Sequence, residues 1–453
     1  MLAAMKHFRI GAGAGYAGDR IDPAQALAEH GQLDVLVFEC LAERTIALAQ
    51  LRRLGDSGHG YDPLLQERMR AVLQACVAQG VTIISNMGAA NPLAAGQAVL
   101  QVARELGLPR LKVAVVTGDD VLGWVQGKGH GESLPLLDRP GCAGDLGLAL
   151  VSANAYLGAD ALLPALASGA DVVITGRVAD PALFLAPLMH RFGWRGDDWA
   201  RLGQGVLVGH LLECAAQISG GYIADPGHFE VPNLEQLGFP LAEVQPDGTA
   251  TITKLDGTGG RVDRLTCTAQ LLYEIEDPSR YLQPDVVADF SRVQLQETGP
   301  NRVQVHGASG TARPDQLKAT LGYRDGFIGE GQISYAGPGA VARGQLALRL
   351  LQHRLDRLGW GAMEHRAELI GVNAMHGASL GADRTPYEVR LRLAVRCSTR
   401  AQAERVGQEV EALYLNGPAA GGGVTQHVRE VVAAASVLIP RTAVRPSVHL
   451  MGL

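Results

Sequence analysis

The sequence predicts an α/β protein with a mostly parallel sheet and flanking helices, followed by a C-terminal α+β region. Three observations lead to this prediction. Up to about residue 200, short β-branched runs alternate with helical stretches, as in successive βα units. Several of these runs are almost wholly apolar, which is typical of strands buried on both faces. From about residue 321 the expected elements follow the order βαββαβ, either as a ferredoxin-like unit or woven into a larger sheet.

Six strands are expected in the first part of the chain, at residues 8–10, 34–38, 81–85, 112–116, 148–152 and 171–175. The helices between them have clear boundary signals. Asn91-Pro92 opens one helix, which Gly107 closes, and Asp22-Pro23 opens another, with Asp22 as its N-cap. This alternation predicts a parallel sheet covered by helices.

The remainder of the chain has a different pattern. Residues 241–253 predict a hairpin around Pro246-Asp247-Gly248, and short strands are expected near residues 270–272, 285–291 and 302–305. The C-terminal pattern comprises strands at 327–335, 367–372, 387–397 and 429–439 and helices at 341–358 and 399–414. We therefore divide the chain into an α/β domain (residues 1–228), a β-rich connecting region (229–320) and the ferredoxin-like α+β region (321–453).

The composition excludes several classes of function. The chain has 453 residues, with 40 basic and 46 acidic side chains and no basic block, so we expect no nucleic-acid partner. It contains no apolar run of about 18 residues and begins without the apolar segment of a secretory signal, so we expect a cytoplasmic protein without a membrane partner. The six cysteines are scattered without a Cys-x-x-Cys pair, which argues against structural zinc and against a disulfide framework.

The loop after the first strand, residues 10–20, is rich in glycine and is the first candidate ligand site. Its spacing Gly13-x-Gly15-x-x-Gly18 matches the dinucleotide fingerprint, and Glu39 follows at roughly the 20 residues expected of a ribose-binding acid. In a true fingerprint, however, the glycines open the helix itself. Because the next helix starts only at Asp22-Pro23, an anion or acyl-carrier pocket and a structural turn remain as alternatives. The candidate binding residues of this loop are Gly13, Gly15, Tyr16, Asp19 and Arg20.

A second glycine loop spans residues 256–260 and includes Gly259 and Gly260. It is either a turn or a second wall of the ligand site, placed against the first loop.

Polar residues follow every expected strand of the α/β domain. In open α/β sheets, ligands bind beyond the carboxyl ends of the strands, so these residues are expected to form one rim. The candidates are Glu39, Asn86, Gly88, Asp119, Asp120, Asn154, Arg177 and Asp180. Asp180 precedes a proline and could instead be an N-cap, and Asp119-Asp120 could cap a short helix. Glu39 is harder to explain structurally, because a carboxylate at the end of so apolar a strand is costly to bury unless it is paired or used.

Three histidines lie in unusual settings. His59 and His130 have glycine neighbours, so each belongs either to a loop that carries an acid or base over the substrate or to an ordinary solvated loop. His210, Glu213 and Cys214 would share one helix face, with the spacing of metal ligands. A core helix in which one hydrogen bond satisfies His210 is the alternative that we favour.

Several long motifs occur together in this chain: residues 10–20, 34–43, 84–92, 174–180 and 257–260. In this combination the sequence resembles the acyclic terpene utilisation (AtuA) family over most of its length. The resemblance implies a role in the catabolism of branched acids as coenzyme A thioesters, of the kind met when citronellol and geraniol are degraded. It implies no settled reaction and no catalytic residues. Longer members carry a small C-terminal domain, so a separate small subunit is one possible partner.

Three hypotheses follow. The first is a lyase or hydratase acting on a branched acyl-CoA thioester or hydroxy acid, with Glu39 as general base, Arg177 holding a carboxylate or phosphate, and the glycine loops lining the pocket. The second is a hydrolase that uses a divalent metal on Asp119, Asp120 and a histidine such as His130. The third is a non-catalytic binding subunit. We expect a small-molecule substrate, a homo-oligomer, and no cofactor beyond coenzyme A unless the second hypothesis holds.

Overall fold

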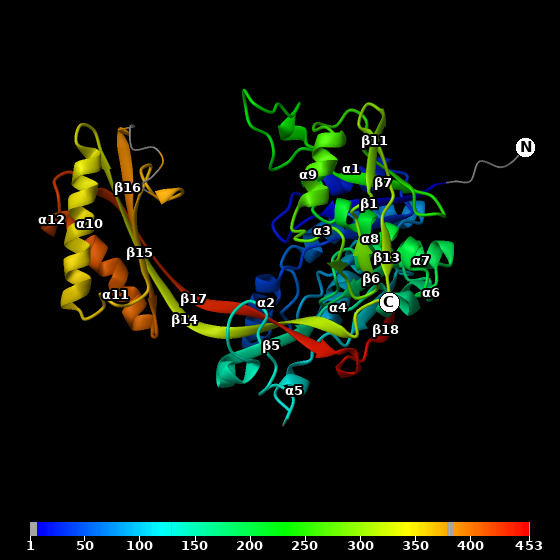
Figure 1. The fold of residues 1–453 in the computed structure, drawn as a ribbon, viewed down its shortest axis with the longest axis horizontal. Helices are drawn as coiled ribbons and strands as arrows, with labels where there is room; N and C mark the ends of the chain where they lie inside the picture. The colour runs from blue at the N-terminus through cyan, green and yellow to red at the C-terminus, as the bar shows by residue number, and fades with distance from the viewer. Residues whose placement is uncertain (1–6, 128, 378–379, 381–384, 453) are drawn as a thin grey trace, which may run out of the picture. The chain divides into compact units, whose positions relative to one another are not determined.

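The computed structural model describes residues 7–127, 129–377, 380 and 385–452, which form two compact units (Figure 1). Unit 1 comprises Met1–Gly322 and Ala434–Leu453, and unit 2 comprises Tyr323–Ala433. The residues that the sequence placed in a connecting region, 229–320, contribute strands to the main sheet of unit 1. The α/β class predicted from the sequence is confirmed.

Unit 1 is built on a ten-stranded sheet with a parallel centre. The central order is β1 (Phe8–Ala14), β2 (Val35–Phe38), β3 (Thr82–Ser85), β6 (Val172–Thr175) and β4 (Lys112–Thr117). These five strands pair in parallel, so their carboxyl ends share one edge. Their apolar side chains are buried, as the patterns predict.

Antiparallel strands extend both sides of this centre. Beyond β1 lie β7 (Pro240–Val244), β8 (Ala250–Lys254), β12 (Arg302–His306) and β11 (Gln294–Gly299), and beyond β4 lies β18 (Ser447–Gly452). The β7–β8 pair is the hairpin that the sequence predicts around Pro246-Asp247-Gly248. The three short strands β9 (Tyr281–Leu282), β10 (Val287–Asp289) and β13 (Ser309–Thr311) form a separate sheet.

Two expectations about unit 1 are wrong. The expected strand at residues 148–152 is β5 (Leu150–Ala155), which lies outside the parallel sheet and pairs with β14 (Gln316–Ala336). No edge is free for β5 at this end of the sheet, because β6 pairs with β3 and β4, and the outer edge of β4 pairs with β18. Residues 270–272 belong to the helix α9 (Arg264–Leu272), since Asp263 and Thr266 cap that helix reciprocally.

Helices form two groups on the sheet. One group is α1 (Asp22–His30), α3 (Leu65–Gln79) and α4 (Pro92–Glu105), and the other is α6 (Leu163–Ala167), α7 (Ala182–Phe192) and α8 (Trp199–Leu212). In Figure 1 strands β1 and β6 lie between α3 and α7. The Asn91 side chain caps α4 as predicted, whereas Asp22 lies inside the first turn of α1, whose N-cap is Ile21. The short α5 (Leu122–Val125) follows β4, and α2 (Glu43–Gly55) packs on β5.

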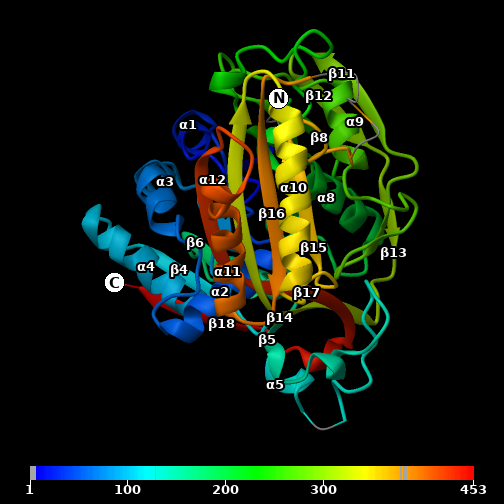
Figure 2. The same ribbon diagram turned by 90° about the vertical axis from the view of Figure 1, so that its left-hand side faces the viewer.

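Unit 2 contains part of β14, α10 (Ala340–Arg357), β15 (His365–Ile370), β16 (Glu388–Cys397), α11 (Arg400–Glu411), α12 (Leu413–Asn416) and part of β17 (Gly422–Pro440). Its strand order is β15-β16-β14-β17. Figure 2 shows α10 and α11 packed side by side on one face of these strands.

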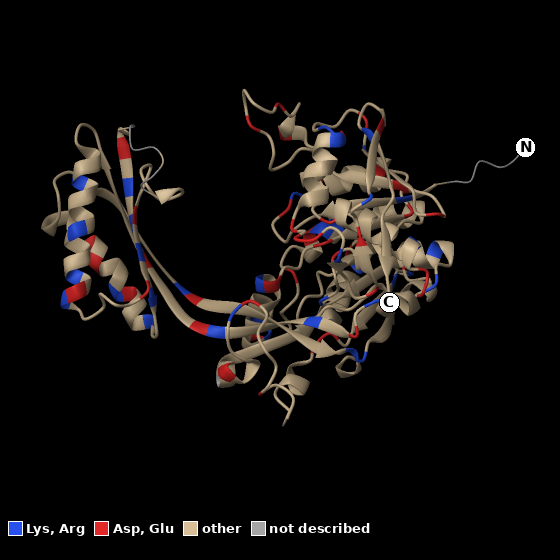
Figure 3. Cartoon of the chain, viewed as in Figure 1, with Lys and Arg blue, Asp and Glu red and all other residues tan. Residues whose placement is uncertain are grey.

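The side chains of β16 alternate between buried apolar residues and exposed or partly exposed residues, which are charged except for Ala394. Figure 3 shows basic and acidic residues interspersed along the strands of unit 2, where Arg392 pairs with both Glu330 and Glu368. One sheet face is therefore a hydrophobic core under the helices, and the other carries ion pairs.

Within the described part of the chain, we find no helix that is both long enough and apolar enough to cross a membrane.

Candidate functional site

The ends of β2 and β3 are tied together by Glu39 and Asn86. The Asn86 amide nitrogen Nδ2 donates to Glu39 Oε1 at 2.9 Å, and Asn86 Oδ1 accepts from the Cys40 backbone N–H at 2.8 Å. The Leu41 N–H also donates to Glu39 Oε1, at 2.8 Å. Asn86 therefore orients the carboxyl group that directly follows the apolar strand β2.

Glu39 has an environment that favours its neutral form. Burial raises its pKa to about 8, and the charge of Asp180 acts in the same direction, while Arg177 opposes both. Both hydrogen bonds go to Oε1, which leaves Oε2 to carry a proton. The raised pKa favours the protonated form near neutral pH, where this carboxyl group can donate a proton.

Asp119 links the ends of β4, β5 and β6. Its Oδ2 accepts from Asn154 Nδ2 at 2.8 Å and from the Arg177 backbone N–H at 2.9 Å. Burial raises its pKa to about 6, although these two hydrogen bonds act to lower it. Gly176 is needed at this point, because a Cβ there would lie 2.6 Å from the Asp119 carboxylate. Asp119 thus acts as a buried acceptor that holds neighbouring strand ends in register.

Arg177 is fully buried and largely engaged by the protein itself. Its guanidinium donates to the backbone carbonyls of Leu41 and Val178 and forms an ion pair with Asp180. It also lies over the Tyr156 ring, 4.4 Å from the ring centroid. Although burial by itself lowers the pKa of Arg177, Asp180 and other acidic neighbours keep it above its ordinary value. Arg177 therefore supplies a permanent positive charge whose hydrogen-bond donors are mostly in use.

A cavity of about 1110 Å³ lies beside this network, and Tyr156, Arg177 and Asp180 line it. On its wall, Glu43 Oε1 accepts from Lys318 Nζ at 2.5 Å and from the Tyr156 hydroxyl at 3.1 Å. Two further lining residues, Arg44 and Arg280, have side chains without a hydrogen bond or ion pair to any described residue. The cavity thus combines a buried arginine with two free cationic groups.

Comparison with known proteins identifies the family. A sequence model described as the acyclic terpene utilisation family protein AtuA matches residues 8–450. The chain belongs to the AtuA family. No curated protein matches it in sequence.

In this AtuA-family chain the glycines of the first loop allow close packing. A Cβ on Gly13 would meet the Phe38 ring at 2.7 Å, and one on Gly15 would meet the Cys214 backbone at 2.4 Å. Gly88 is similarly confined, since a Cβ there would lie 2.4 Å from the Thr175 carbonyl oxygen. These glycines bring the strand ends and the chain after α8 together around Glu39.

Arg68 is a residue of this region that sequence reasoning missed. It is fully buried in α3, and its Nη2 donates to the carbonyls of Ala17 and Asp19 at 3.1 Å each. Its Nη1 lies 3.0 Å from Cys40 Sγ. The helical spacing of Leu65, Met69 and Val72 already places Arg68 on the buried face of α3, so the signal was present in the sequence. Through these hydrogen bonds, the buried side chain of Arg68 holds the first glycine loop against α3.

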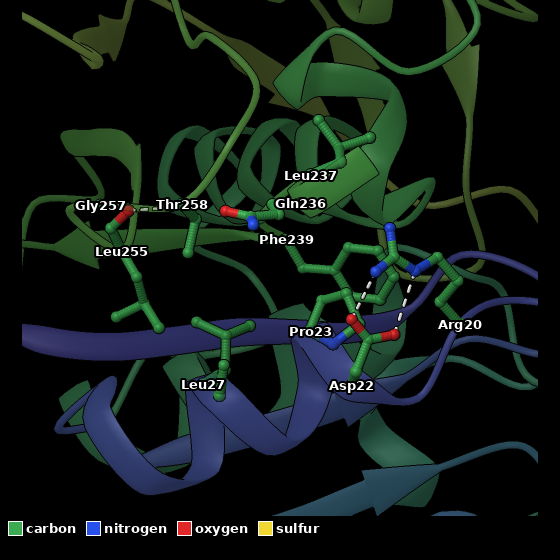
Figure 4. A pocket seen from close by; sticks show the side chains of 12 residues that line it. Arg20, Asp22, Pro23, Leu27, Gln236, Leu237, Phe239, Leu255, Gly257 and Thr258 are labelled. Carbon is green, nitrogen blue, oxygen red and sulfur yellow. Dashed lines mark hydrogen bonds and ion pairs between the residues drawn. The ribbon is translucent and has the colours of Figure 1, made fainter. Parts of the chain in front are cut away.

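The two glycine loops meet at a smaller pocket of about 190 Å³ (Figure 4). Arg20 lines it, and its guanidinium donates to Asp22 at 2.5 and 3.0 Å. Gly257 and Thr258 line it from the second loop. Gly260 has φ +85°, and a Cβ on Gly259 would lie 1.8 Å from the Asn233 carbonyl oxygen. This pocket has no lining residue in common with the large cavity.

The side chains of the other candidates form no hydrogen bond to Glu39, Asn86, Asp119, Asn154 or Arg177 among the described residues, although the charge of Asp120 raises the pKa of Asp119. Asp19 Oδ2 accepts from the Gly15 N–H at 2.9 Å, while Tyr16 is largely exposed. Asp120 is exposed and caps the Leu122 N–H at 3.1 Å. His130 is exposed and stacks on Trp124, with 4.6 Å between ring centroids.

The described residues contain no group of three His, Cys, Asp or Glu side chains placed to hold a metal ion. His210, which has the spacing of a metal ligand, uses both ring nitrogens in contacts with Glu213 and the Leu271 carbonyl.

Proposed function

We propose that this AtuA-family chain is an enzyme that binds a branched acyl-CoA thioester, or a related hydroxy acid, in the large cavity and acts on it as a lyase or hydratase. The observation that carries the proposal is the cavity itself, beyond the carboxyl ends of β2 and β6, with Arg44 and Arg280 free on its wall. Ligands of open α/β sheets bind at such an edge.

The lining suits a ligand with an apolar body and an anionic end. Leucines from distant parts of the chain contribute apolar surface: Leu137, Leu282, Leu317 and Leu438. A branched acyl chain would pack against them, and the cationic groups would take phosphate or carboxylate oxygens.

Adding or removing water, or breaking a carbon–carbon bond beside a carbonyl, requires a group that gives and takes a proton near neutral pH. Glu39 is such a group, with its pKa raised to about 8 by burial. Its neighbours Arg177 and Asp180, whose charges act on it, line the cavity. We assign Glu39 the proton transfer and Arg177 the fixed charge that organises the site.

The test is binding of a series of acyl-CoA thioesters and branched hydroxy acids by isothermal titration calorimetry. The double variant Arg44→Ala/Arg280→Ala should bind about tenfold more weakly, because two exposed charge interactions together contribute roughly 1.4 kcal/mol. Arg110→Ala is the matched control, since Arg110 is exposed, without a partner among the described residues, and not part of the cavity lining.

If the wild-type protein bound none of these compounds, the proposal would be refuted. Binding without turnover would favour a non-catalytic subunit. Arg177→Ala is a weaker test, because it also removes contacts to Leu41, Val178 and Asp180 and so disturbs the fold.

We further propose that unit 2 is a ferredoxin-like module, which its element order and antiparallel pairing support. We also propose that the enzyme acts in the cytoplasm as a homo-oligomer, with or without a small separate subunit.

A further inference from the structure

Three residues that line the large cavity contact one another: Glu43, Tyr156 and Lys318. Glu43 begins α2, Tyr156 follows β5, and Lys318 lies in β14, so the tertiary structure brings them together. Glu43 Oε1 accepts from Lys318 Nζ at 2.5 Å and from the Tyr156 hydroxyl at 3.1 Å. The side chains of Glu43 and Lys318 are 41% and 44% exposed. Both charged groups are therefore open to the space of the cavity.

The hydrogen bonds of Glu43 leave one of its carboxylate oxygens available. A carboxylate only accepts hydrogen bonds, so the phenolic hydrogen of Tyr156 points to Glu43. The Thr320 hydroxyl, which is buried, lies 3.5 Å from the Tyr156 oxygen and donates to it. Glu43 Oε2 accepts no hydrogen bond from any described residue. A carboxylate that is held through one oxygen and free at the other can take a proton from a ligand.

Lys318 has hydrogen-bond donors that the protein does not use. An ammonium group has three hydrogens, and Glu43 is its one hydrogen-bond acceptor among the residues that the structure describes. Lys318 Nζ also lies 5.2 Å from the centroid of the Tyr156 ring, which Arg177 contacts as well. These contacts hold the ammonium group in place on the cavity wall. It can therefore stabilise an oxygen that becomes negative next to Glu43.

Three other acidic residues line the cavity: Asp180, Glu274 and Asp315. Asp180 forms an ion pair with the buried Arg177. Neither Glu274 nor Asp315 has an ion pair with a side chain in the described part of the chain. Within that part, Glu43 is thus the lining carboxylate that both a lysine and a tyrosine hold.

The surroundings of Glu43 favour its charged form. Burial by itself raises the pKa of Glu43, but the hydrogen bond and the charge of Lys318, together with the Tyr156 hydrogen bond, bring it below its ordinary value. The first turn of a helix, where Glu43 lies, also stabilises negative charge. Glu39 differs, since burial raises its pKa to about 8. Two carboxyl groups whose pKa values are moved apart in this way are typical of a base and an acid.

We propose that Glu43 is the catalytic base of the cavity, and that Lys318 stabilises the enolate formed when Glu43 removes an α-hydrogen from an acyl thioester. In this step the C–H bond breaks and an O–H bond forms on Glu43 Oε2. The electron pair left on the α-carbon passes into the thioester carbonyl, whose oxygen becomes negative and accepts from Lys318 Nζ. Return of the proton restores the thioester.

The inference rests on the proposed function, because it requires an acyl thioester in the cavity. It selects the thioester over a free acid, since a free carboxylate already carries the negative charge to which an enolate would add. Tyr156 acts through Glu43 and is a positioning residue. Glu39 remains the group that gives a proton.

The first experiment follows the α-hydrogens of isovaleryl-coenzyme A in D₂O by proton NMR, with the full-length protein. Wild type should replace them by deuterium. In Glu43→Gln, the side-chain carbonyl still accepts from Lys318 but cannot take a proton, so the exchange should slow by at least about 100-fold while the thioester still binds. Glu67→Gln is the control and should exchange as wild type does, since Glu67 is exposed on α3 and outside the cavity lining. Exchange at the wild-type rate in Glu43→Gln would overturn the inference.

The second experiment measures the pH dependence of this exchange. Because the carboxylate is the base, the wild-type rate should rise with pH through the pKa of Glu43 and then level off. Tyr156→Phe removes a hydrogen bond to the charged form, so the rise should move to higher pH. A Tyr156 with only a structural role would change the melting temperature and leave the midpoint of the rise in place. That result would contradict the inference.

Isothermal titration calorimetry with the same thioester separates the two proposals. If the wild type bound isovaleryl-coenzyme A but did not exchange its α-hydrogens, the inference alone would be wrong. If the wild type bound branched hydroxy acids and no thioester, the inference would again be wrong and the proposed function would stand. If neither kind of compound bound, both would be wrong.

Discussion

Replacing Arg68 by methionine tests how the first glycine loop is held. Methionine retains much of the buried side-chain volume but removes the hydrogen bonds of the guanidinium, of which the two shortest to the loop go to the carbonyls of Ala17 and Asp19. At about 1.5 kcal/mol each, their loss should lower the free energy of unfolding of unit 1 by about 3 kcal/mol. The substitution also removes the cation that lies 3.8 Å from the buried carboxylate of Asp62.

The assay is urea unfolding combined with hydrogen–deuterium exchange. Exchange should accelerate in residues 15–20, where the N–H of Asp19 donates to the Tyr16 carbonyl and the N–H of Gly15 donates to Asp19. Arg70→Met is the matched control on the same helix, because Arg70 is half-exposed and pairs with Glu105 on the surface, a contact worth less than about 1 kcal/mol. If Arg68→Met lowered the free energy of unfolding no more than Arg70→Met does, the hydrogen bonds of Arg68 would not be what holds the first glycine loop in place.

Two other substitutions test the centre of the site. In the folded protein Glu39 keeps a proton that it releases in the unfolded chain. The free energy of unfolding of the wild type should therefore fall as pH rises from about 4.5 to about 8. In urea unfolding at several pH values, Glu39→Gln should reduce this fall by a few kcal/mol. Identical pH dependence in the two proteins would contradict the burial of a neutral Glu39. Gly15→Ala should destabilise unit 1 by about 2 kcal/mol, because the added Cβ would meet backbone atoms of Cys214. The control is Gly123→Ala in α5, where the added Cβ meets no atom within 4 Å, so this substitution should be neutral or slightly stabilising. Equal urea midpoints for these two variants would contradict this prediction, because they would show that the backbone near Cys214 can accommodate a Cβ at position 15 without loss of stability.

Local patterns in the sequence were sufficient for much of unit 1. The apolar runs that became β2 and β6 are buried on both faces, and the Asn91-Pro92 signal begins α4 where expected. Both features depend on interactions within a few residues, which periodicity and capping chemistry report directly. The order of strands does not depend on local chemistry, so β5 could not be excluded from the parallel sheet and β18 was not anticipated.

In the candidate site, too, some features followed from local sequence patterns and others depended on tertiary contacts. Polar residues after parallel strands were expected to gather at one edge, and Glu39, Asn86, Asp119 and Arg177 do lie close together there. Asn154 also contacts Asp119, but it lies in β5, outside the parallel sheet. Two partners of Arg177 could not be foreseen, because the Leu41 carbonyl and the Tyr156 ring are brought in by other segments.

By itself, the sequence determined that this is an α/β chain of the AtuA type with a glycine loop near its start and a carboxyl group at the end of an apolar strand. Only the tertiary structure decided what those features do. Gly15 is needed because Cys214, nearly 200 residues later, packs against it, and Glu39 keeps its proton because burial and Asp180 disfavour its charge. Desolvation and steric exclusion depend on which distant atoms surround a group, and no local pattern contains that information.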